Sequence, residues 1–545
     1  MKDYLRSILR DALLALDVNE EEIPEIEIEK PNQPEHGDAA TNLAMQLAGT
    51  LRDNPRSIAG RIVEALDYDE RRVASVEIAG PGFINFRYAD AWLVDELSRI
   101  EGQGEDFGRT GSYAGQKALV EFVSANPTGP LTVGHGRNAV LGDTIARLLE
   151  WSGAEVDREY YFNDAGRQMR LLGESVRARY LQELGRGAEL PEEGYQGEYI
   201  REIARAMADE HGDDLADTDE VEPFREKAKE MIFEEIQATL ARMGIRMDRY
   251  FNEGSLYEDG SIDRVLEVFR EKNLTYDEEG AVWFRTTDFG KDKDTVLVKS
   301  SGEPTYRLPD IAYHADKLER DYDLHIDVFG ADHIDTFPDV LSGVEVLGYD
   351  ASKVDVVVYQ FVSIVKEGKP FKMSTRKANF VTLDELMDEV GADVTRFFFL
   401  MRSPNTHLEF DIAEAKEAGE KNPVFYLQYA HARIQSILRK VAEEYGEDES
   451  AAELERLDHP SETQLIKSMV RFPEIVQSAA EHREPHRLIS YLNDLASHFT
   501  TFYHDCRILG EEPELAMART RLARATAVVL ANGLTILGIS APDQM

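Results

Sequence analysis

The sequence of 545 residues is poor in cysteine, in positive charge and in long apolar runs. Its single cysteine, Cys506, excludes disulfides within the chain and zinc sites of the CxxC type, and this usage fits a reducing cytosol. The longest apolar run, residues 525–539, is too short to span a bilayer. Arg6 and Arg10 interrupt the N-terminal apolar stretch, which excludes a signal peptide. We therefore expect a cytoplasmic protein without a membrane segment.

The shortage of positive charge is large. Lys and Arg total 61 against 104 Asp and Glu, which gives a net charge of −43 and a pI near 4.7. Nucleic-acid-binding proteins are usually basic, so composition alone argues against one. The acidity fits either an ordinary protein with solvated charged faces or one adapted to a cytoplasm of very high salt. The acidic residues are spread along the whole chain, which favours the second explanation and a halophilic, archaeon-like source.

The second explanation predicts that stability and activity rise as KCl is raised into the molar range. Salt screens the repulsion among massed carboxylates, and the screening length falls from ~10 Å near 0.1 M to a few Å near 1 M. Unfolding midpoints and activity measured across a KCl series test this prediction. Full activity at about 50 mM KCl, where screening is weak, would contradict it.

Three regions of the chain differ in pattern. Residues 1–110 predict a small α/β domain, residues 111–395 alternate strands with helices in the manner of a parallel sheet, and residues 396–545 read as helical without a strand. A helical, acidic stretch at about 170–275 reads as an insertion into the second region. Within the first region we expect a helix at 37–48 and two strands joined at Pro81-Gly82. In the second we expect strands at 117–124, 156–163, 281–286, 295–300, 324–330 and 354–365.

Two elements of the second region suit phosphate chemistry. The stretch NPTGPLTVGHGRN joins a strand to a helix, where small residues let a ligand approach the backbone and the helix start favours phosphate. His135 could reach that phosphate, although such a stretch alone is more often an ordinary strand–helix turn. The second element is a cationic loop, which suits a transition state that develops negative charge on phosphate but could also be an exposed loop without a role. Its cations are Lys366, Lys369, Lys372, Arg376 and Lys377.

In this order the two elements resemble the HIGH and KMSKS signatures of class I aminoacyl-tRNA synthetases. They read Thr132-Val133-Gly134-His135 and Lys372-Met373-Ser374-Thr375-Arg376. EFVSANPTGPL, GADH, KMSTRKANFVTLDEL and NPVFYLQYAHARI are typical of the arginyl-tRNA synthetase family, and the resemblance runs from about residue 30 to the C-terminus. Two positions depart from the family pattern: Thr132 replaces the first histidine of HIGH, and Ala378 replaces the last glycine of MSTRKG.

The resemblance implies a Rossmann-type parallel-sheet catalytic domain between an N-terminal α/β domain that binds the tRNA elbow and an all-α anticodon-binding domain. It implies ligation of L-arginine to tRNA(Arg) through an arginyl-adenylate, with ATP as cosubstrate. Mg²⁺ would be carried mainly by ATP, no zinc or other metal would be bound by the protein, and the chain would act as a monomer.

The resemblance also implies roles for individual residues. Carboxylates in the amino-acid pocket would suit the planar guanidinium fork. The implied catalytic residues are His135, Lys372 and Lys377; the other ATP-binding residues are Thr132, Gly134, Gly330, Asp332, His333, Met373 and Ser374. The implied arginine-binding residues are Glu121, Ser124, Asn126, Tyr306 and Asp310, and the implied tRNA-binding residues are Tyr426, Gln428, Tyr429 and Arg433.

Plainer interpretations stay open at this point. Tyr306 alone could be a core aromatic, Asp310 a carboxylate at a helix start, and the helix with Tyr429 mostly core. Another class I synthetase or nucleotidyl transferase could share the fold, and Thr132 suggests a paralogue that binds tRNA without charging it. Glu121, Tyr306 and Asp310 argue for arginine, because a pocket for an uncharged amino acid has no use for them.

Overall fold

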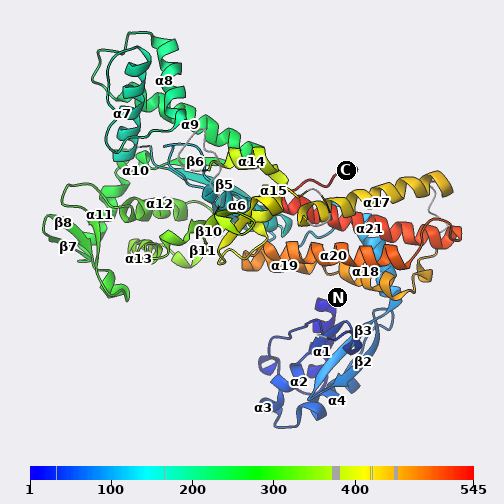
Figure 1. Ribbon diagram of the computed structural model, residues 1–545. Coiled ribbons are helices and arrows are strands. Elements are labelled where there is room, and N and C mark those ends of the chain that lie inside the picture. Colours follow the sequence, from blue (N-terminus) through cyan, green and yellow to red (C-terminus); the bar gives the residue numbers. More distant parts are fainter. Residues whose placement is uncertain (32, 165, 371–380, 418, 420–421, 447–451) are drawn as a thin grey trace. The chain divides into compact units, whose positions relative to one another are not determined.

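A computed structural model describes residues 1–31, 33–164, 166–370, 381–417, 419, 422–446 and 452–545 (Figure 1). The chain divides into two compact units. The first consists of Met1–Phe107, Arg433–Arg471 and Leu495–Val529, and the second of Gly108–Ala432, Phe472–Asp494 and Leu530–Met545. The C-terminal helical region therefore contributes to both units.

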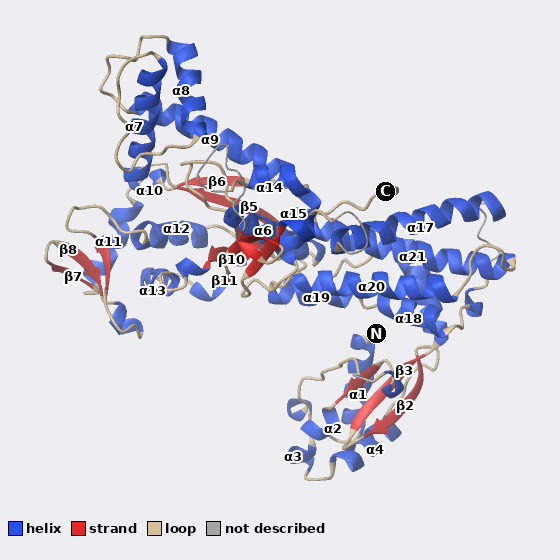
Figure 2. Cartoon of the chain, in the orientation of Figure 1, coloured by secondary structure: helices blue, strands red, loops and turns tan. Residues whose placement is uncertain are grey.

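The N-terminal part of the first unit is an antiparallel sheet of order β1-β3-β2 with four helices (Figure 2). Its strands are β1 (Ala39–Thr41), β2 (Val73–Ala79) and β3 (Phe83–Tyr88), and its helices are α1 (Lys2–Ala15), α2 (Leu43–Gln46), α3 (Ala48–Leu51) and α4 (Pro55–Ala65). The predicted strand pair is confirmed. The helix predicted at 37–48 is wrong in its first half, because residues 39–41 are buried and pair with β3.

Helices make up the rest of the first unit. They are α5 (Asp90–Gln103), α18 (Pro460–Met469) and parts of α17 (Pro423–Tyr445), α20 (His486–Asp505) and α21 (Pro513–Leu537). Two arginines of α21 fasten them: Arg519 Nε donates to Glu462 of α18 at 2.6 Å, and Arg521 Nε donates to Glu101 of α5 at 2.9 Å.

The second unit contains a five-stranded parallel sheet of order β11-β10-β4-β5-β6. Its strands are β4 (Lys117–Glu121), β5 (Glu155–Phe162), β6 (Arg249–Asn252), β10 (Leu324–Gly330) and β11 (Val354–Tyr359). The prediction of a parallel sheet is confirmed. The order places β4 in the centre with β10 beside it, and because the strands are parallel, the residues that follow them meet at one edge of the sheet.

Several strand predictions need correction. The strands predicted at 281–286 and 295–300 lie outside the parallel sheet: β8 (Ala281–Phe284) and β9 (Thr295–Val298) form an antiparallel sheet with β7 (Thr275–Glu278). Residues 354–365 form two strands, β11 and β12 (Val362–Lys366). The prediction of no strand beyond 396 is wrong, because β14 (Leu408–Asp411) pairs in parallel with β12, which also pairs with β13 (Lys369–Pro370).

Helices connect and cover these strands. They are α6 (Val133–Trp151), α12 (Arg307–Glu319), α13 (Phe337–Leu347), α14 (Leu383–Val390), α15 (Ala392–Leu400), α16 (Ile412–Ala415) and α19 (Phe472–His482). The expected insertion contains α7 (Gly166–Glu183), α8 (Glu198–His211), α9 (Glu222–Arg242), α10 (Gly254–Glu258) and α11 (Ser261–Glu271), but also β6, which joins the main sheet. Within the ranges described above, no helix is long and apolar enough to cross a membrane.

Candidate active site

Three carboxylates stand side by side in the middle of the parallel sheet. Asp327 on β10, Glu121 on β4 and Glu159 on β5 occupy the same register, and all three are buried. Residues at one register of parallel strands point to the same face. Buried ionised carboxylates need partners, so the helix above them must supply cations or donors.

Helix α12 supplies them. Lys317 Nζ donates to Glu121 Oε2 at 2.7 Å and also to Asp327, and His314 Nε2 lies 2.9 Å from Asp327 Oδ2. Lys317 is 1% exposed, so it forms a buried ion triad with Glu121 and Asp327. Glu159 accepts hydrogen bonds from Tyr313 Oη at 2.6 Å and from Arg320 Nη1 at 2.5 Å.

The chain turns sharply after β4 and brings two polar residues back to the carboxylate row. Ser124 Oγ donates to Glu121 Oε1 at 2.9 Å. Asn126 accepts from the Asn163 backbone N–H at 3.2 Å and donates to Gln168 at 3.0 Å. All three residues expected to bind arginine from this segment therefore lie together at the carboxyl end of β4.

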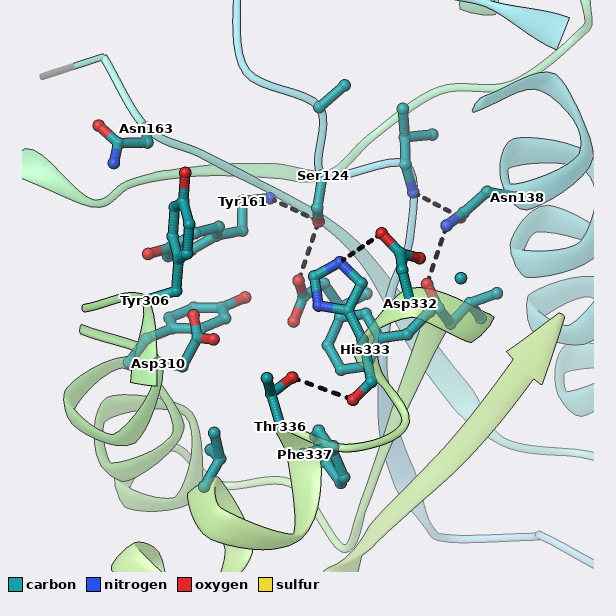
Figure 3. A pocket seen from close by; sticks show the side chains of 18 of the residues that line it. Ser124, Asn138, Tyr161, Asn163, Tyr306, Asp310, Asp332, His333, Thr336 and Phe337 are labelled. Carbon is teal, nitrogen blue, oxygen red and sulfur yellow. Dashed lines mark hydrogen bonds and ion pairs between the residues drawn. The ribbon is translucent and has the colours of Figure 1, made fainter. Parts of the chain in front are cut away.

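A cavity of about 550 Å³ opens at this edge of the sheet (Figure 3). Figure 3 shows Asn163, Tyr306 and Asp310 on one side of the cavity and Asp332 and His333 on the other. Nine of the expected site residues line the cavity: Glu121, Ser124, Asn126, His135, Tyr306, Asp310, Gly330, Asp332 and His333. The sequence segments that carry them are far apart, and the sheet brings them together.

The side of the cavity that holds Asp310 is acidic and poorly solvated. Burial raises the pKa of Asp310 to about 7, with Glu121 and Glu253 adding to the shift and His314 and Lys317 opposing it. Burial also raises the pKa of Glu121, against the opposing charge of Lys317, and the pKa of Glu253. In the part of the chain that the structure describes, no donor reaches the Asp310 carboxylate. Such a pocket favours a cationic ligand group, which would restore the charged form of Asp310.

Glu253 follows β6 and is fixed by two aromatic hydroxyls and an amide. It accepts from Tyr161 Oη at 2.6 Å, from Asn163 Nδ2 at 2.7 Å and from Tyr257 Oη at 3.3 Å. Glu253 is 4% exposed and lines the same cavity as Asp310. The cavity therefore has a second acidic group besides Asp310, and hydrogen bonds from its donors fix the orientation of that group.

Tyr306 and Asp310 lie at the start of α12. Tyr306 is the residue before the helix, and Asp310 is in its first turn just after Pro309, as the sequence predicts. Tyr306 is 70% exposed, which excludes the interpretation of a core aromatic. Its ring borders the cavity that holds Asp310.

Thr132 and His135 form a reciprocal cap at the start of α6, where His135 lines the cavity. The Thr132 backbone N–H donates to His135 Nδ1 at 3.2 Å, and the His135 N–H donates to Thr132 Oγ1 at 3.4 Å. A ring nitrogen that accepts from a backbone N–H carries no proton, so the neutral imidazole has its proton on Nε2. Burial lowers the His135 pKa and keeps this neutral form. Thr132, the departure from HIGH, thus orients the histidine that remains.

The two expected ATP-binding glycines, Gly330 and Gly134, differ in whether a side chain would fit in their place. A side chain at Gly330 would collide with the Asp332 carboxylate. At Gly134, an added Cβ would meet Thr132 Oγ1 at 3.6 Å, an ordinary contact, so no described protein atom requires glycine there. Asp332 and His333 pair across 3.8 Å at the rim.

The second signature lies outside the described residues. Lys372, Met373, Ser374 and Lys377 all fall within 371–380. The adjacent β12 and β13 are described and pair Lys366 with Lys369.

The residues expected to bind tRNA lie on α17 in different settings. Tyr429 is 39% exposed, and the Arg433 guanidinium lies 6.0 Å from the centre of the Tyr503 ring. Gln428 is buried, and its amide donates to Asp393 at 2.8 Å and to Ser540 Oγ at 3.0 Å. The structure therefore gives Gln428 core contacts, as the plainer interpretation of this helix expects. Tyr426 is partly buried.

The parallel sheet, a histidine at the start of the helix after β4, and a cavity at the carboxyl ends of the strands define a class I aminoacyl-tRNA synthetase catalytic domain. Residues 102–398 match the family described as tRNA synthetases class I (R), catalytic domain. Residues 3–88 match the arginyl tRNA synthetase N terminal domain, and residues 427–545 match the DALR anticodon binding domain.

The chain belongs to the arginyl-tRNA synthetase family. It is 56% identical to an arginine–tRNA ligase of Salinibacter ruber over the whole of both chains. It is 51% identical to one of Desulfotalea psychrophila, over 95% of this chain and 94% of the relative. The Thermus thermophilus arginyl-tRNA synthetase structure, 24% identical over 99% of each chain with a TM-score of 0.77, has the same fold.

Several residues of the site were not predicted from the sequence. Glu253 and Asn163 each follow a strand of the parallel sheet, where ligand-binding residues of such sheets gather. His314 and Lys317 lie four and seven residues after Asp310, which places all three on one face of α12. Their helical spacing from Asp310 is the sequence signal that could have identified them.

Proposed function

We propose that this protein ligates L-arginine to tRNA(Arg) at the expense of ATP, through an arginyl-adenylate. The observation that carries the proposal is the position of Asp310 in an acidic pocket. Its carboxylate lines a buried acidic pocket, burial raises its pKa to about 7, and Glu253 lines the same pocket. A guanidinium offers five donors in a plane and keeps its charge, so it can engage two carboxylates together.

The first step needs positioning more than acid–base chemistry. The carboxylate of arginine attacks the α-phosphorus of ATP, and pyrophosphate leaves with the electrons of the broken P–O bond. Since a carboxylate is already nucleophilic, the site must hold it in line and stabilise the phosphate charge. The His135 Nε2–H would donate to a phosphate oxygen, and we propose Lys372 and Lys377 as the cations that act with it. Gly330, Asp332, His333, Met373 and Ser374 would hold the nucleotide.

In the second step, the 2′-hydroxyl of the terminal adenosine of tRNA attacks the arginyl carbonyl and AMP leaves. Residues 1–110 would bind the tRNA elbow and residues 396–545 the anticodon. Candidate contacts in the second region are Tyr426, Tyr429 and Arg433. We propose that the chain acts in the cytoplasm as a monomer, with functional divisions at 1–110, 111–395 and 396–545.

Mg²⁺ would enter with the nucleotide. Among the residues that the structure describes, no group of three or more His, Cys, Asp or Glu side chains could hold a metal ion. Phosphate oxygens of ATP would provide most of the Mg²⁺ ligands, and the ion would neutralise part of the phosphate charge. Asp332 is the carboxylate of the rim that could meet its hydration shell.

Charging of total tRNA tests the proposal. Each amino acid is supplied with ATP and tRNA in about 2 M KCl, where long-range repulsion between protein and tRNA is screened. We expect arginine alone to be attached, with lysine disfavoured by about 10³-fold or more because its compact ammonium lacks the planar fork that meets a carboxylate with two parallel hydrogen bonds. Attachment of another amino acid would overturn the substrate. Binding of tRNA without any charging would indicate a non-catalytic paralogue.

A further inference from the structure

The turn after β4 has an unusual backbone. Val123 has a φ of 69° and Ser124 a φ of 42°, so two consecutive residues with side chains occupy the left-handed region. That region is strained for residues with a Cβ and most strained for a β-branched residue such as valine. Val123 is also 5% exposed, so it has no freedom to relax toward solvent.

The turn decides which side chains face the pocket. In an extended strand, Val123 would share the face of Glu121 and Ser124 would point away. Because the chain folds back at these two residues, Ser124 Oγ instead donates to Glu121 at 2.9 Å and accepts from the Tyr161 backbone N–H at 3.3 Å. One of the two contacts that hold the Glu121 carboxylate, the one from Ser124, thus depends on a backbone conformation that Val123 and Ser124 disfavour.

One side chain holds the turn in place. Asn138 of α6 is 5% exposed, and its Oδ1 accepts from the Val123 N–H at 2.7 Å while its Nδ2 donates to the Val328 carbonyl at 2.9 Å (Figure 3). It thereby ties the turn after β4 to the end of β10. Asn138 also lies three residues after His135, on the same face of α6.

We infer that Asn138 is a positioning residue that holds the strained Val123–Ser124 turn in the arginine-binding shape and ties it to the helix that presents His135. This inference rests on the proposed function for the identity of the substrate. It assigns no contact between Asn138 and the reacting atoms. Its effect reaches arginine through Glu121, Ser124 and Asn126.

The test compares the KM for arginine with the KM for ATP. In Asn138→Ala, we expect the KM for arginine to rise between tenfold and about a hundredfold, as when a buried N–H loses its acceptor, while the KM for ATP changes by less than about threefold. Val123→Gly should recover much of this loss in the double variant, because glycine adopts a positive φ at little cost. A merely structural role of Asn138 would not be rescued at Val123.

Two further variants keep the test decisive. Asn138→Asp retains an acceptor for Val123, so its KM for arginine should lie between those of wild type and Asn138→Ala, although it buries a carboxylate opposite the Val328 carbonyl and should be less stable. If Asn138→Ala does not fold alone, its double variant with Val123→Gly is compared with Val123→Gly. Asn422→Ala is the matched control. Asn422 is also buried, donates to the Ala415 carbonyl and accepts from the Val424 N–H, so its loss should lower stability without a selective rise in the KM for arginine.

Parallel rises in both KM values, or no recovery by Val123→Gly in a folded double variant, would overturn the inference. The hydrogen-exchange rate of the backbone amides in the peptide containing residues 121–126 reports on the turn in the absence of substrate. Faster exchange in Asn138→Ala, reversed toward wild type in Asn138→Asp, is expected even if the protein charges a different amino acid, so failure of the proposed function would be recognised separately.

Discussion

Asp310→Asn should lower kcat/KM for arginine by about 10³-fold, equivalent to roughly 4 kcal/mol. The substitution keeps the shape of the side chain and removes its charge. A guanidinium transferred into the buried pocket would then lack its nearest counter-charge, and Glu253 is already engaged by Tyr161 and Asn163. Charging kinetics at saturating tRNA and ATP measure the change.

The pH dependence gives an independent check on Asp310. Its pKa is raised to about 7, so a large fraction is neutral below that pH and cannot pair with a guanidinium. Arginine binds the ionised form, so the KM for arginine should fall as pH rises from about 6 to about 8, approaching tenfold per unit on the acid side, and then level off. Asp310→Asn should abolish this dependence.

Asp316→Asn is the matched control for Asp310→Asn. Asp316 lies on the same helix but outside the cavity, where it pairs with Arg320. Its substitution should change kcat/KM by less than about twofold, since partly exposed pairs contribute little. If Asp310→Asn charges tRNA as well as wild type does, Asp310 is not the guanidinium partner, and Glu253 becomes the candidate.

How far the sequence could predict this site depended on where each residue lies. Glu121, Ser124 and Asn126 share one segment with the first signature, and Asp310 stands beside a proline in the first turn of a helix. Glu253 gave no such signal, because β6 has only four residues within a stretch that reads as helical. Its role emerges only when β6 pairs with β5 and brings Glu253 to the cavity.

The misassigned strands have a related cause. Apolar runs identify strands, but they do not specify the sheet to which a strand belongs. The segments containing β8 and β9 resemble those of β4 and β10, yet they pair with each other and with β7 in a separate sheet. Thr132 presents the opposite case: as a missing histidine it suggested a defect, while the structure gives it the cap that orients His135.

Lys317→Met should lower the free energy of unfolding by about 3–5 kcal/mol at neutral pH, the cost of leaving a buried charge without its partner. Lys317 is the shared cation of Glu121 and Asp327, and all three side chains are buried. Burial alone would raise the pKa of Asp327, but Lys317 and then His314 hold it below the usual value. Methionine keeps most of the volume, so the loss reports charge rather than packing.

The sign of the pH effect follows from the same contacts. A carboxylate whose pKa is depressed in the folded state stabilises the fold above its unfolded pKa, and this contribution is lost as pH falls. Without Lys317 the largest cause that lowers the Asp327 pKa is lost and only His314 opposes burial, while the Glu121 pKa rises further. The difference in stability between wild type and Lys317→Met should therefore be largest near neutral pH and shrink toward about pH 4, where the two carboxyls of the variant take up protons.

Denaturant unfolding of two companion variants identifies the source of the loss. Lys317→Met with Asp327→Asn should recover part of the stability, because one uncompensated charge is removed. Lys227→Met, in which the lysine pairs with Glu210 and Glu230 on the surface at 3.2 Å, should cost less than about 1 kcal/mol. If Lys317→Met were as stable as wild type at neutral pH, Glu121 and Asp327 would not both be ionised in the fold. The acidic row beneath α12 would then hold protons of its own, and arginine would meet a less negative pocket than the one described above.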